Sequence, residues 1–206
     1  MKEIMEAYST TFISCMDDWP SEFKEDIYKL YAYLRVCDEM VEGEKELHDF
    51  KQWREVIEEF YKVSDKYQFD GEWLSDFHIS MYQDLIKKDH TVTSMLEYCK
   101  GSAESVGMMI SKMMGCDPRS EPHARALGRA YQIINFVRDY REDVERGYHY
   151  IDGDDLAFYC KLYQKEIDFA MKGIDYIPES MRKPILMANE KYDEVALQVL
   201  TRGMRA

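Results

Sequence analysis

Residues 127–147, LGRAYQIINFVRDYREDVERG, combine the pattern of a buried helix with a row of polar side chains. At about 100° per residue, the polar residues share one narrow stripe: Gln132, Asn135, Asp139, Asp143 and Arg146. Isoleucine, phenylalanine, valine and tyrosine occupy most of the remaining circumference. A helix that is apolar nearly all round is expected to be buried, so its carboxylates cannot all face bulk water.

A second stretch, LYAYLRVCDEMVEG at residues 30–43, has the same design. Four of its residues fall within a stripe about 60° wide, namely Tyr31, Arg35, Asp38 and Glu42. A buried ionised carboxylate destabilises a protein by several kcal/mol unless it is paired or binds a metal. The lysines and arginines of the two stripes are expected to be too few to neutralise these acids.

Hard divalent cations would satisfy both stripes if the stripes face each other across a cavity. Mg²⁺ takes one or two carboxylates, keeps several waters and recruits substrate phosphates, so the pattern predicts a phosphorylated substrate. The spacing of Asp38 to Glu42 and of Asp139 to Asp143 puts each pair about 6 Å apart at Cβ on one helical face. Spacing alone leaves an alternative open, in which these are ordinary helix acids partnered by arginines.

The periodicity of the whole chain predicts an all-α protein, and its 206 residues, 46% of them hydrophobic, are expected to form one domain. Strand patterns are almost absent. After a short N-terminal helix, the sequence predicts helices at residues 21–43, 47–67, 71–87, 92–114, 121–147, 155–176 and 180–203.

Charge and composition exclude several classes of function. A net charge of −13 argues against a nucleic-acid partner, because phosphates would repel the chain. Five scattered cysteines without a zinc pattern fit a reducing cytoplasm. No apolar run approaches the roughly 20 residues that span a bilayer, so the chain is expected to be soluble or peripheral to a membrane. The histidines include no Glu-x-x-His, which disfavours a di-iron bundle, and the run KKDH at residues 87–90 is expected to be solvated surface.

Five segments together resemble the squalene/phytoene synthase family of head-to-head prenyl transferases. They occur in the family's order: YSTTF at residues 8–12, the acidic stretch at 30–43, MYQDL at 81–85, LEYCKGSAESVGMM at 96–109, and 126–151. The resemblance implies the isoprenoid synthase fold, an all-α bundle with a central apolar cavity capped by the two acidic helices. It also implies one such domain over residues 1–206, shortened after about residue 156 and at the C-terminus.

The implied reaction joins two farnesyl or geranylgeranyl diphosphates through their first carbons. It would pass through a cyclopropylcarbinyl diphosphate to a squalene- or phytoene-type hydrocarbon. Mg²⁺, or Mn²⁺ in its place, would be held by Asp38, Glu42, Asp139 and Asp143. A cytoplasmic enzyme with peripheral membrane contact for product release is expected. The choice between C15 and C20 substrates, the use of NADPH and the oligomeric state stay open. The alternative is a non-catalytic relative that acts as an assembly or lipid-binding protein.

The resemblance also implies roles for individual residues. The expected catalytic residues are Tyr31, Arg35, Tyr98, Tyr150 and Tyr192. The expected substrate-binding residues are Ser9, Phe12, Gln132, Asn135, Arg138 and Arg146, with Phe12 walling the hydrocarbon cavity.

Three residues depart from the family pattern. Glu39 and Glu42 stand where the family usually has aspartate, and Glu104 stands where glycine is usual. The longer side chain of Glu42 would move its oxygens by about a bond length, enough to alter rate or metal geometry. Glu104 is expected either to narrow the cavity or to face outward.

Overall fold

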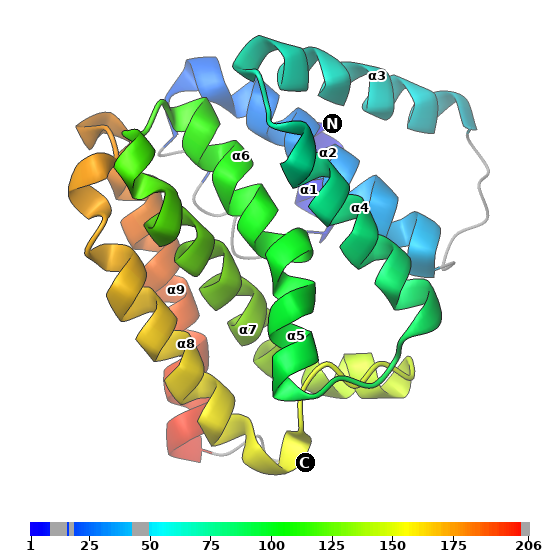
Figure 1. Ribbon diagram of the computed structural model, residues 1–206, viewed down its shortest axis with the longest axis vertical. Helices are drawn as coiled ribbons and strands as arrows, with labels where there is room; N and C mark the ends of the chain where they lie inside the picture. Colours follow the sequence, from blue (N-terminus) through cyan, green and yellow to red (C-terminus); the bar gives the residue numbers. More distant parts are fainter. Residues whose placement is uncertain (9–15, 17–18, 43–49, 203–206) are drawn as a thin grey trace.

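Helices dominate the computed structural model, which describes residues 1–8, 16, 19–42 and 50–202 (Figure 1). The described residues form no β-strand, and only an isolated bridge joins Asp89 to His149. The all-α prediction is therefore confirmed. The helices are α1 Lys2–Tyr8, α2 Ser21–Glu42, α3 Phe50–Tyr67, α4 Gly71–Ile86, α5 Val92–Cys99, α6 Ser105–Met114, α7 Glu121–Glu145, α8 Leu156–Met171 and α9 Glu179–Arg202.

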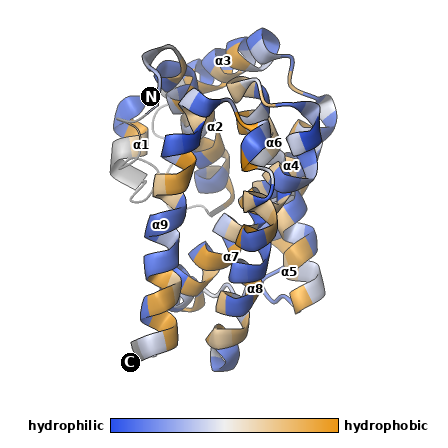
Figure 2. Cartoon of the chain, turned by 90° about the vertical axis from the view of Figure 1, so that its left-hand side faces the viewer, coloured by the Kyte–Doolittle hydropathy of each residue, from blue (hydrophilic) through white to orange (hydrophobic). Residues whose placement is uncertain are grey.

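Helix α7 lies at the centre of the bundle and packs against α6, α8 and α9 (Figure 1). Ile133, Ile134 and Val137 are completely buried, so the predicted burial of this helix is confirmed. On the left of Figure 1, α8 and α9 form the outer layer, and Figure 2 shows hydrophilic residues along much of their outer surface. None of the described helices is long and apolar enough to cross a membrane.

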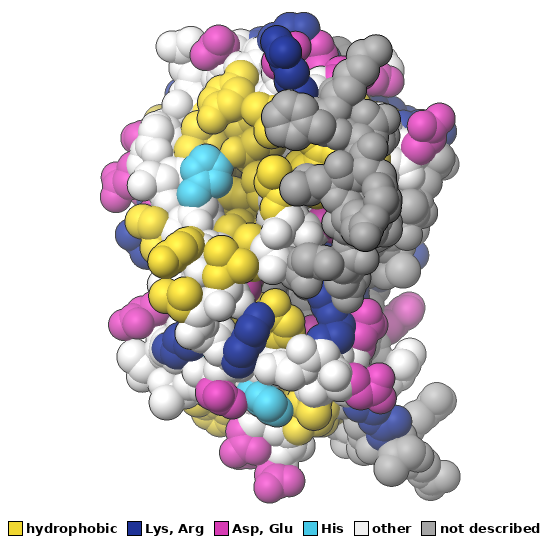
Figure 3. Space-filling model, turned by 90° about the vertical axis from the view of Figure 1, so that its right-hand side faces the viewer, with side chains coloured by type: hydrophobic (Ala, Val, Ile, Leu, Met, Phe, Trp, Pro, Cys, Tyr) yellow, Lys and Arg dark blue, Asp and Glu magenta, His cyan; other side chains and the backbone are white. Residues whose placement is uncertain are grey.

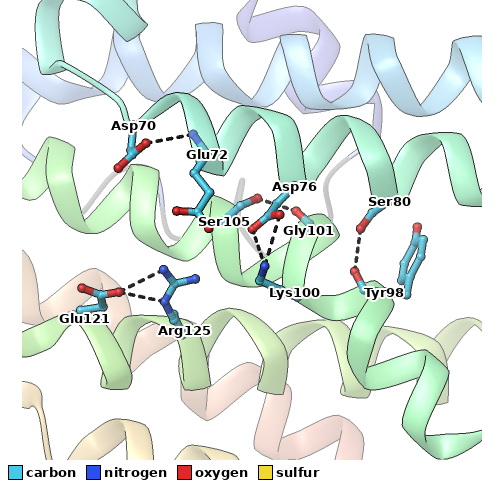
Figure 4. A network of polar contacts seen from close by, with 10 residues as sticks. All are labelled: Asp70, Glu72, Asp76, Ser80, Tyr98, Lys100, Gly101, Ser105, Glu121 and Arg125. Atoms are coloured by element: carbon cyan, nitrogen blue, oxygen red, sulfur yellow. Dashed lines mark hydrogen bonds and ion pairs between the residues drawn. The ribbon is translucent and has the colours of Figure 1, made fainter.

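The predicted continuous helix at 92–114 contains a π-helical turn, η2, at Lys100–Glu104. A Cβ atom on Gly101 would lie 2.0 Å from the Asp76 carbonyl oxygen, so only glycine lets η2 approach α4 this closely. The Ser80 hydroxyl donates to the Tyr98 carbonyl at 2.9 Å, and the Ser105 hydroxyl donates to the Gly101 carbonyl (Figure 4). Serine hydroxyls thus bond carbonyls around the irregular turn, which directly follows Tyr98.

Other helix ends differ from the predictions by a few residues. Helix α8 ends at Met171 and a short 3₁₀ turn, η5, follows at Ile174–Tyr176, whereas one helix over 155–176 was predicted. The break lies beside α7, because a Cβ on Gly173 would lie 2.3 Å from the His123 ring. The predicted helix start at residues 47–49 lies outside the described residues.

Candidate active site

A cavity of about 300 Å³ lies among α2, α6, α7 and α9. Most of its lining is apolar and includes Ile27, Leu30 and Leu34 of α2, Val106, Ile110 and Met114 of α6, Leu127 of α7 and Ile185 of α9. The cavity brings together five residues of the predicted site: Tyr31, Gln132, Asn135, Arg138 and Tyr192. An apolar space of this kind suits a hydrocarbon chain with a polar group at one end.

Each polar stripe contributes part of the lining of this cavity, namely Tyr31 from α2 and Gln132 and Asn135 from α7. Asp38 lies two helical turns beyond Tyr31, and Asp139 lies one turn beyond Asn135, each on the same helical face. The acids therefore continue the lining stripes toward the C-terminal ends of α2 and α7.

Arginines engage two of these acids. Arg35 forms an ion pair with Asp38, and Arg138 binds Asp139 through two hydrogen bonds of 2.6 Å. The bond to Asp139 is the main cause that raises the pKa of Arg138. Arg35 belongs to the α2 stripe, whereas Arg138 lies beside the α7 stripe, so Asp139 is paired by an arginine that the stripe pattern did not include.

Oxygen atoms suited to a hard cation lie on the C-terminal halves of α2 and α7. Asp38, Asp139 and Asp143 supply carboxylates, and the buried Oδ1 atom of Asn135 has no hydrogen-bond partner among the described residues. Such a donor set is chemically that of Mg²⁺. Across the described ranges, no three histidine, cysteine, aspartate or glutamate side chains are grouped closely enough to hold a metal ion. Ser9, Phe12 and the side chain of Glu42 lie outside the described residues.

Asp84 of α4 joins two of the predicted catalytic tyrosines. Its buried carboxylate accepts hydrogen bonds from the Tyr98 hydroxyl at 2.7 Å and from the Tyr150 hydroxyl at 2.8 Å. Burial raises the pKa of both phenols well above the usual range, and the charge of Asp84 adds to this. Asp38 contributes to the raised pKa of Tyr98, and Asp143 contributes to that of Tyr150. Acids of both stripes therefore act electrostatically on one tyrosine pair.

His90 lies beside this pair, 5.7 Å from Tyr98 and 5.4 Å from Tyr150 between ring centroids. The prediction that residues 87–90 are all solvated surface is wrong for His90, which is half-buried. Its Nε2 atom has no partner within the described part of the chain, and burial lowers the pKa of the ring. No sequence signal pointed to His90. Asp84, in contrast, lies within the MYQDL segment and was missed as a site residue despite that signal.

Tyr131 is a further cavity residue that the sequence interpretation missed. Its hydroxyl donates to Asn189, and its ring lies 4.5 Å from that of Tyr192. Tyr131 lies one turn before Asn135, so its helical position was a usable signal. Arg146 lies outside the cavity lining, with its guanidinium 5.8 Å from the Tyr148 ring.

Glu104 neither narrows the cavity nor faces outward, so both expectations for it are wrong. Its buried carboxylate forms an ion pair with Arg129, which also binds Glu166 at 2.6 Å. The three charges connect η2, α7 and α8 on the side of α7 away from the cavity lining.

Comparison with known proteins gives consistent matches. The family model described as squalene/phytoene synthase matches residues 5–198. The 4,4'-diapophytoene synthase of Staphylococcus haemolyticus is 24% identical over 244 residues, which covers 96% of this chain and 85% of that protein. The chloroplastic phytoene synthase 1 of Arabidopsis thaliana is 28% identical over 217 residues, and this chain spans only about half of it, 51%.

Two solved structures show the same fold. A dehydrosqualene synthase in complex with ligand superposes with a TM-score of 0.84 at 19% identity, covering 98% of this chain and 85% of that one. A squalene synthase from Alicyclobacillus acidocaldarius has a TM-score of 0.82 at 16% identity, with coverage of 98% and 92%.

Proposed function

Since this chain belongs to the squalene/phytoene synthase family, we propose that it joins two prenyl diphosphates head to head to form a squalene- or phytoene-type hydrocarbon. The observation that carries this proposal is the apolar cavity lined by α2 and α7, the two helices that carry the polar stripes and their carboxylates. The apolar lining would hold a prenyl chain. The stripes would place its diphosphate among arginines and acids.

The arginines and acids divide the binding of the diphosphate between them. Asp38 and Asp139, with Asp143, Asn135 and Glu42, are the residues that would hold Mg²⁺. When bound, Mg²⁺ would neutralise the diphosphate and assist its departure as a leaving group. An arriving diphosphate would also offer Arg35 and Arg138 a new anionic partner, which would free their carboxylates for the cation.

The tyrosine pair would shield the carbocation that forms on the substrate when its diphosphate departs. A tyrosine is already protonated at neutral pH, burial raises the pKa of Tyr98 and Tyr150 further, and Asp84 holds both hydroxyls. Neither oxygen is then a phenolate that would trap a carbocation. The rings lie 5.3 Å apart, and Phe136 stacks on Tyr150 at 4.5 Å, so aromatic faces would be available to stabilise positive charge.

Turnover with labelled substrate tests the proposal. Purified protein with Mg²⁺ and labelled farnesyl or geranylgeranyl diphosphate is expected to release pyrophosphate and an extractable hydrocarbon. Asp139→Asn is expected to abolish this turnover with little change in stability, because Asp139 is partly exposed. Glu142→Gln, on an exposed position of the same helix, is the matched control and should retain turnover.

The non-catalytic alternative has one observation in its favour. Asp38 and Asp139 already have arginine partners, as ordinary structural acids would. If the folded protein is inactive with both substrates, and Asp139→Asn lowers the unfolding free energy as much as breaking a structural ion pair does, a binding role replaces the proposed synthase.

A further inference from the structure

Tyr131 and Tyr192 form an aromatic part of the cavity wall. One belongs to α7 and the other to α9, and both line the cavity. Their ring centroids lie 4.5 Å apart, and the two residues are only 7% and 4% exposed. Most of the other lining residues are aliphatic, so this pair presents aromatic surface to a chain bound in the cavity.

A buried amide holds the hydroxyl of Tyr131. This hydroxyl donates a hydrogen bond to the side-chain oxygen of Asn189, which is 6% exposed. The Asn189 amide donates in turn to the Met171 sulfur at 3.0 Å, and a thioether is a weak acceptor. Burying an amide is unfavourable unless it is hydrogen-bonded, so the bond to Tyr131 is the one that stabilises Asn189 most. Asn189 does not line the cavity, so this bond directs the hydroxyl toward α9 and leaves the ring to the cavity.

We propose that Tyr131 is a further catalytic residue, whose ring stabilises the allylic carbocation formed in the cavity, and that Asn189 is the positioning residue that holds this ring. The inference rests on the proposed function. When the bond between the first carbon and the diphosphate oxygen breaks, both electrons leave with the oxygen, and the positive charge stays on the prenyl chain. A cation within about 6 Å of a ring centroid is attracted by the π-electrons of the ring, most strongly where it is desolvated.

Tyr131 lies close to the residue proposed to bind the diphosphate. Arg138 is the seventh residue after it, about 10 Å further along the axis of α7. Side chains of a helix lean toward its N-terminus, which brings the guanidinium nearer to Tyr131. Tyr192 also connects the two, because it packs on Tyr131 and contributes, after the main effect of Asp139, to the raised pKa of Arg138. The first carbon of a diphosphate held by Arg138 would therefore lie near both rings.

Burial distinguishes these rings from the apolar groups on the surface of the molecule. Figure 3 shows hydrophobic side chains gathered on one outer face. On α4, for example, Tyr82 is 60% exposed and Ile86 is 67% exposed. Water at such a surface would capture a carbocation, whereas a site from which water is excluded protects it. Tyr131 and Tyr192 combine aromatic surface with the exclusion of water.

Binding of a cationic analogue tests the role of Tyr131 without turnover. The probe is geranyl-dimethylammonium, in which a charged nitrogen takes the place of the cationic carbon, and geraniol is its uncharged counterpart. Both are titrated by calorimetry into the full chain with Mg²⁺ and inorganic pyrophosphate. Tyr131→Leu is expected to weaken binding of the ammonium about tenfold and to change binding of geraniol little. Tyr131→Phe keeps the ring and should bind both probes as the unmodified chain does.

Leu127→Ala is the matched control, because Leu127 lines the cavity one turn earlier on α7 without an aromatic ring. It should weaken binding of both probes by the same factor. Equal losses for the two probes in Tyr131→Leu would make Tyr131 an ordinary part of the apolar wall and overturn the inference. No binding of the ammonium by the unmodified chain would overturn it as well.

Asn189→Leu tests the positioning role with the same two probes. It is expected to lower the affinity for the ammonium several-fold more than the affinity for geraniol. Adding Tyr131→Phe to Asn189→Leu should restore most of the lost affinity, since phenylalanine needs no acceptor. A purely structural Asn189 would instead lower both affinities equally or neither. Circular dichroism checks folding, and Asn189→Ala and Tyr131→Met are the second variants where the first do not fold.

Turnover with labelled farnesyl diphosphate is measured separately. Tyr131→Leu is expected to lower kcat about tenfold with little change in KM, because the cation exists only after the diphosphate departs. A folded chain that forms no hydrocarbon contradicts the proposed function. The inference itself fails when Tyr131→Leu does not discriminate between the ammonium and geraniol, and this result is read without turnover.

Discussion

The Tyr98 hydroxyl donates a 2.7 Å hydrogen bond to the Asp84 carboxylate and so connects α5 to α4. The same carboxylate accepts a 2.8 Å bond from Tyr150, which follows α7. One buried acid thus connects α4 both to the next helix, α5, and to the distant segment after α7. We therefore expect Asp84 to stabilise this part of the bundle.

Asp84→Ala is expected to lower the free energy of unfolding by about 3 kcal/mol, because it leaves two buried hydroxyls without an acceptor. Asp84→Asn keeps one acceptor oxygen and should lose about half as much. Urea unfolding at neutral pH measures both. A loss no larger than that of Asp89→Ala, at an exposed site, would show that the network contributes nothing to stability.

Alkaline pH is expected to destabilise the protein through the same tyrosines. In the unfolded chain a tyrosine loses its proton near pH 10, whereas folded Tyr98 and Tyr150 keep theirs because burial raises their pKa. The folded state then binds more protons, so this stabilisation is complete below about pH 10 and declines as pH rises, by about 1.4 kcal/mol per pH unit for each tyrosine. Tyr98→Phe should reduce the slope of unfolding free energy against pH by one such contribution. Parallel slopes for the two proteins would contradict the assignment.

Arg129→Met is expected to lower the free energy of unfolding by about 3 kcal/mol, because Glu104 and Glu166 would be left with buried, uncompensated charges. Replacing one carboxylate by a neutral amide, as in Arg129→Met combined with Glu104→Gln, should recover part of the lost unfolding free energy. Chemical denaturation of the single and double variants measures the coupling. If the loss of unfolding free energy in the double variant equals the sum of the losses in the two single variants, Arg129 and Glu104 do not stabilise each other.

Gly128→Ala is expected to destabilise the protein by at least about 2 kcal/mol, although alanine is the better helix former by about 1 kcal/mol. The new Cβ would lie 2.3 Å from the Ala103 carbonyl oxygen, so η2 and α7 would have to separate. Gly71→Ala is the control, since a Cβ there has no neighbour within 4 Å. If the unfolding temperature shifts equally in the two variants, close contact between η2 and α7 at Gly128 does not limit the side chain there.

Much of the fold could be predicted from residue patterns. The acidic helices, their burial and their order along the chain follow from a periodicity that reports which side of a helix faces inward. The π turn at η2 could not be predicted this way, because it depends on how closely Gly101 approaches Asp76 of another helix. The same limit applies to Glu104, whose partner Arg129 is on a different helix and is invisible to local spacing.

The sequence by itself determined the all-α fold, the polar stripes of α2 and α7, from which Tyr31, Gln132 and Asn135 line the cavity, and the family to which the chain belongs. Only the tertiary structure decided that Glu104 pairs with Arg129, and that Asp84 receives both Tyr98 and Tyr150. It also decided that one side of α4 stays uncovered. The physical reason is that helical periodicity depends on neighbours along the chain, whereas ion pairs, shared acceptors and uncovered faces depend on side-chain conformation and on how separate helices pack.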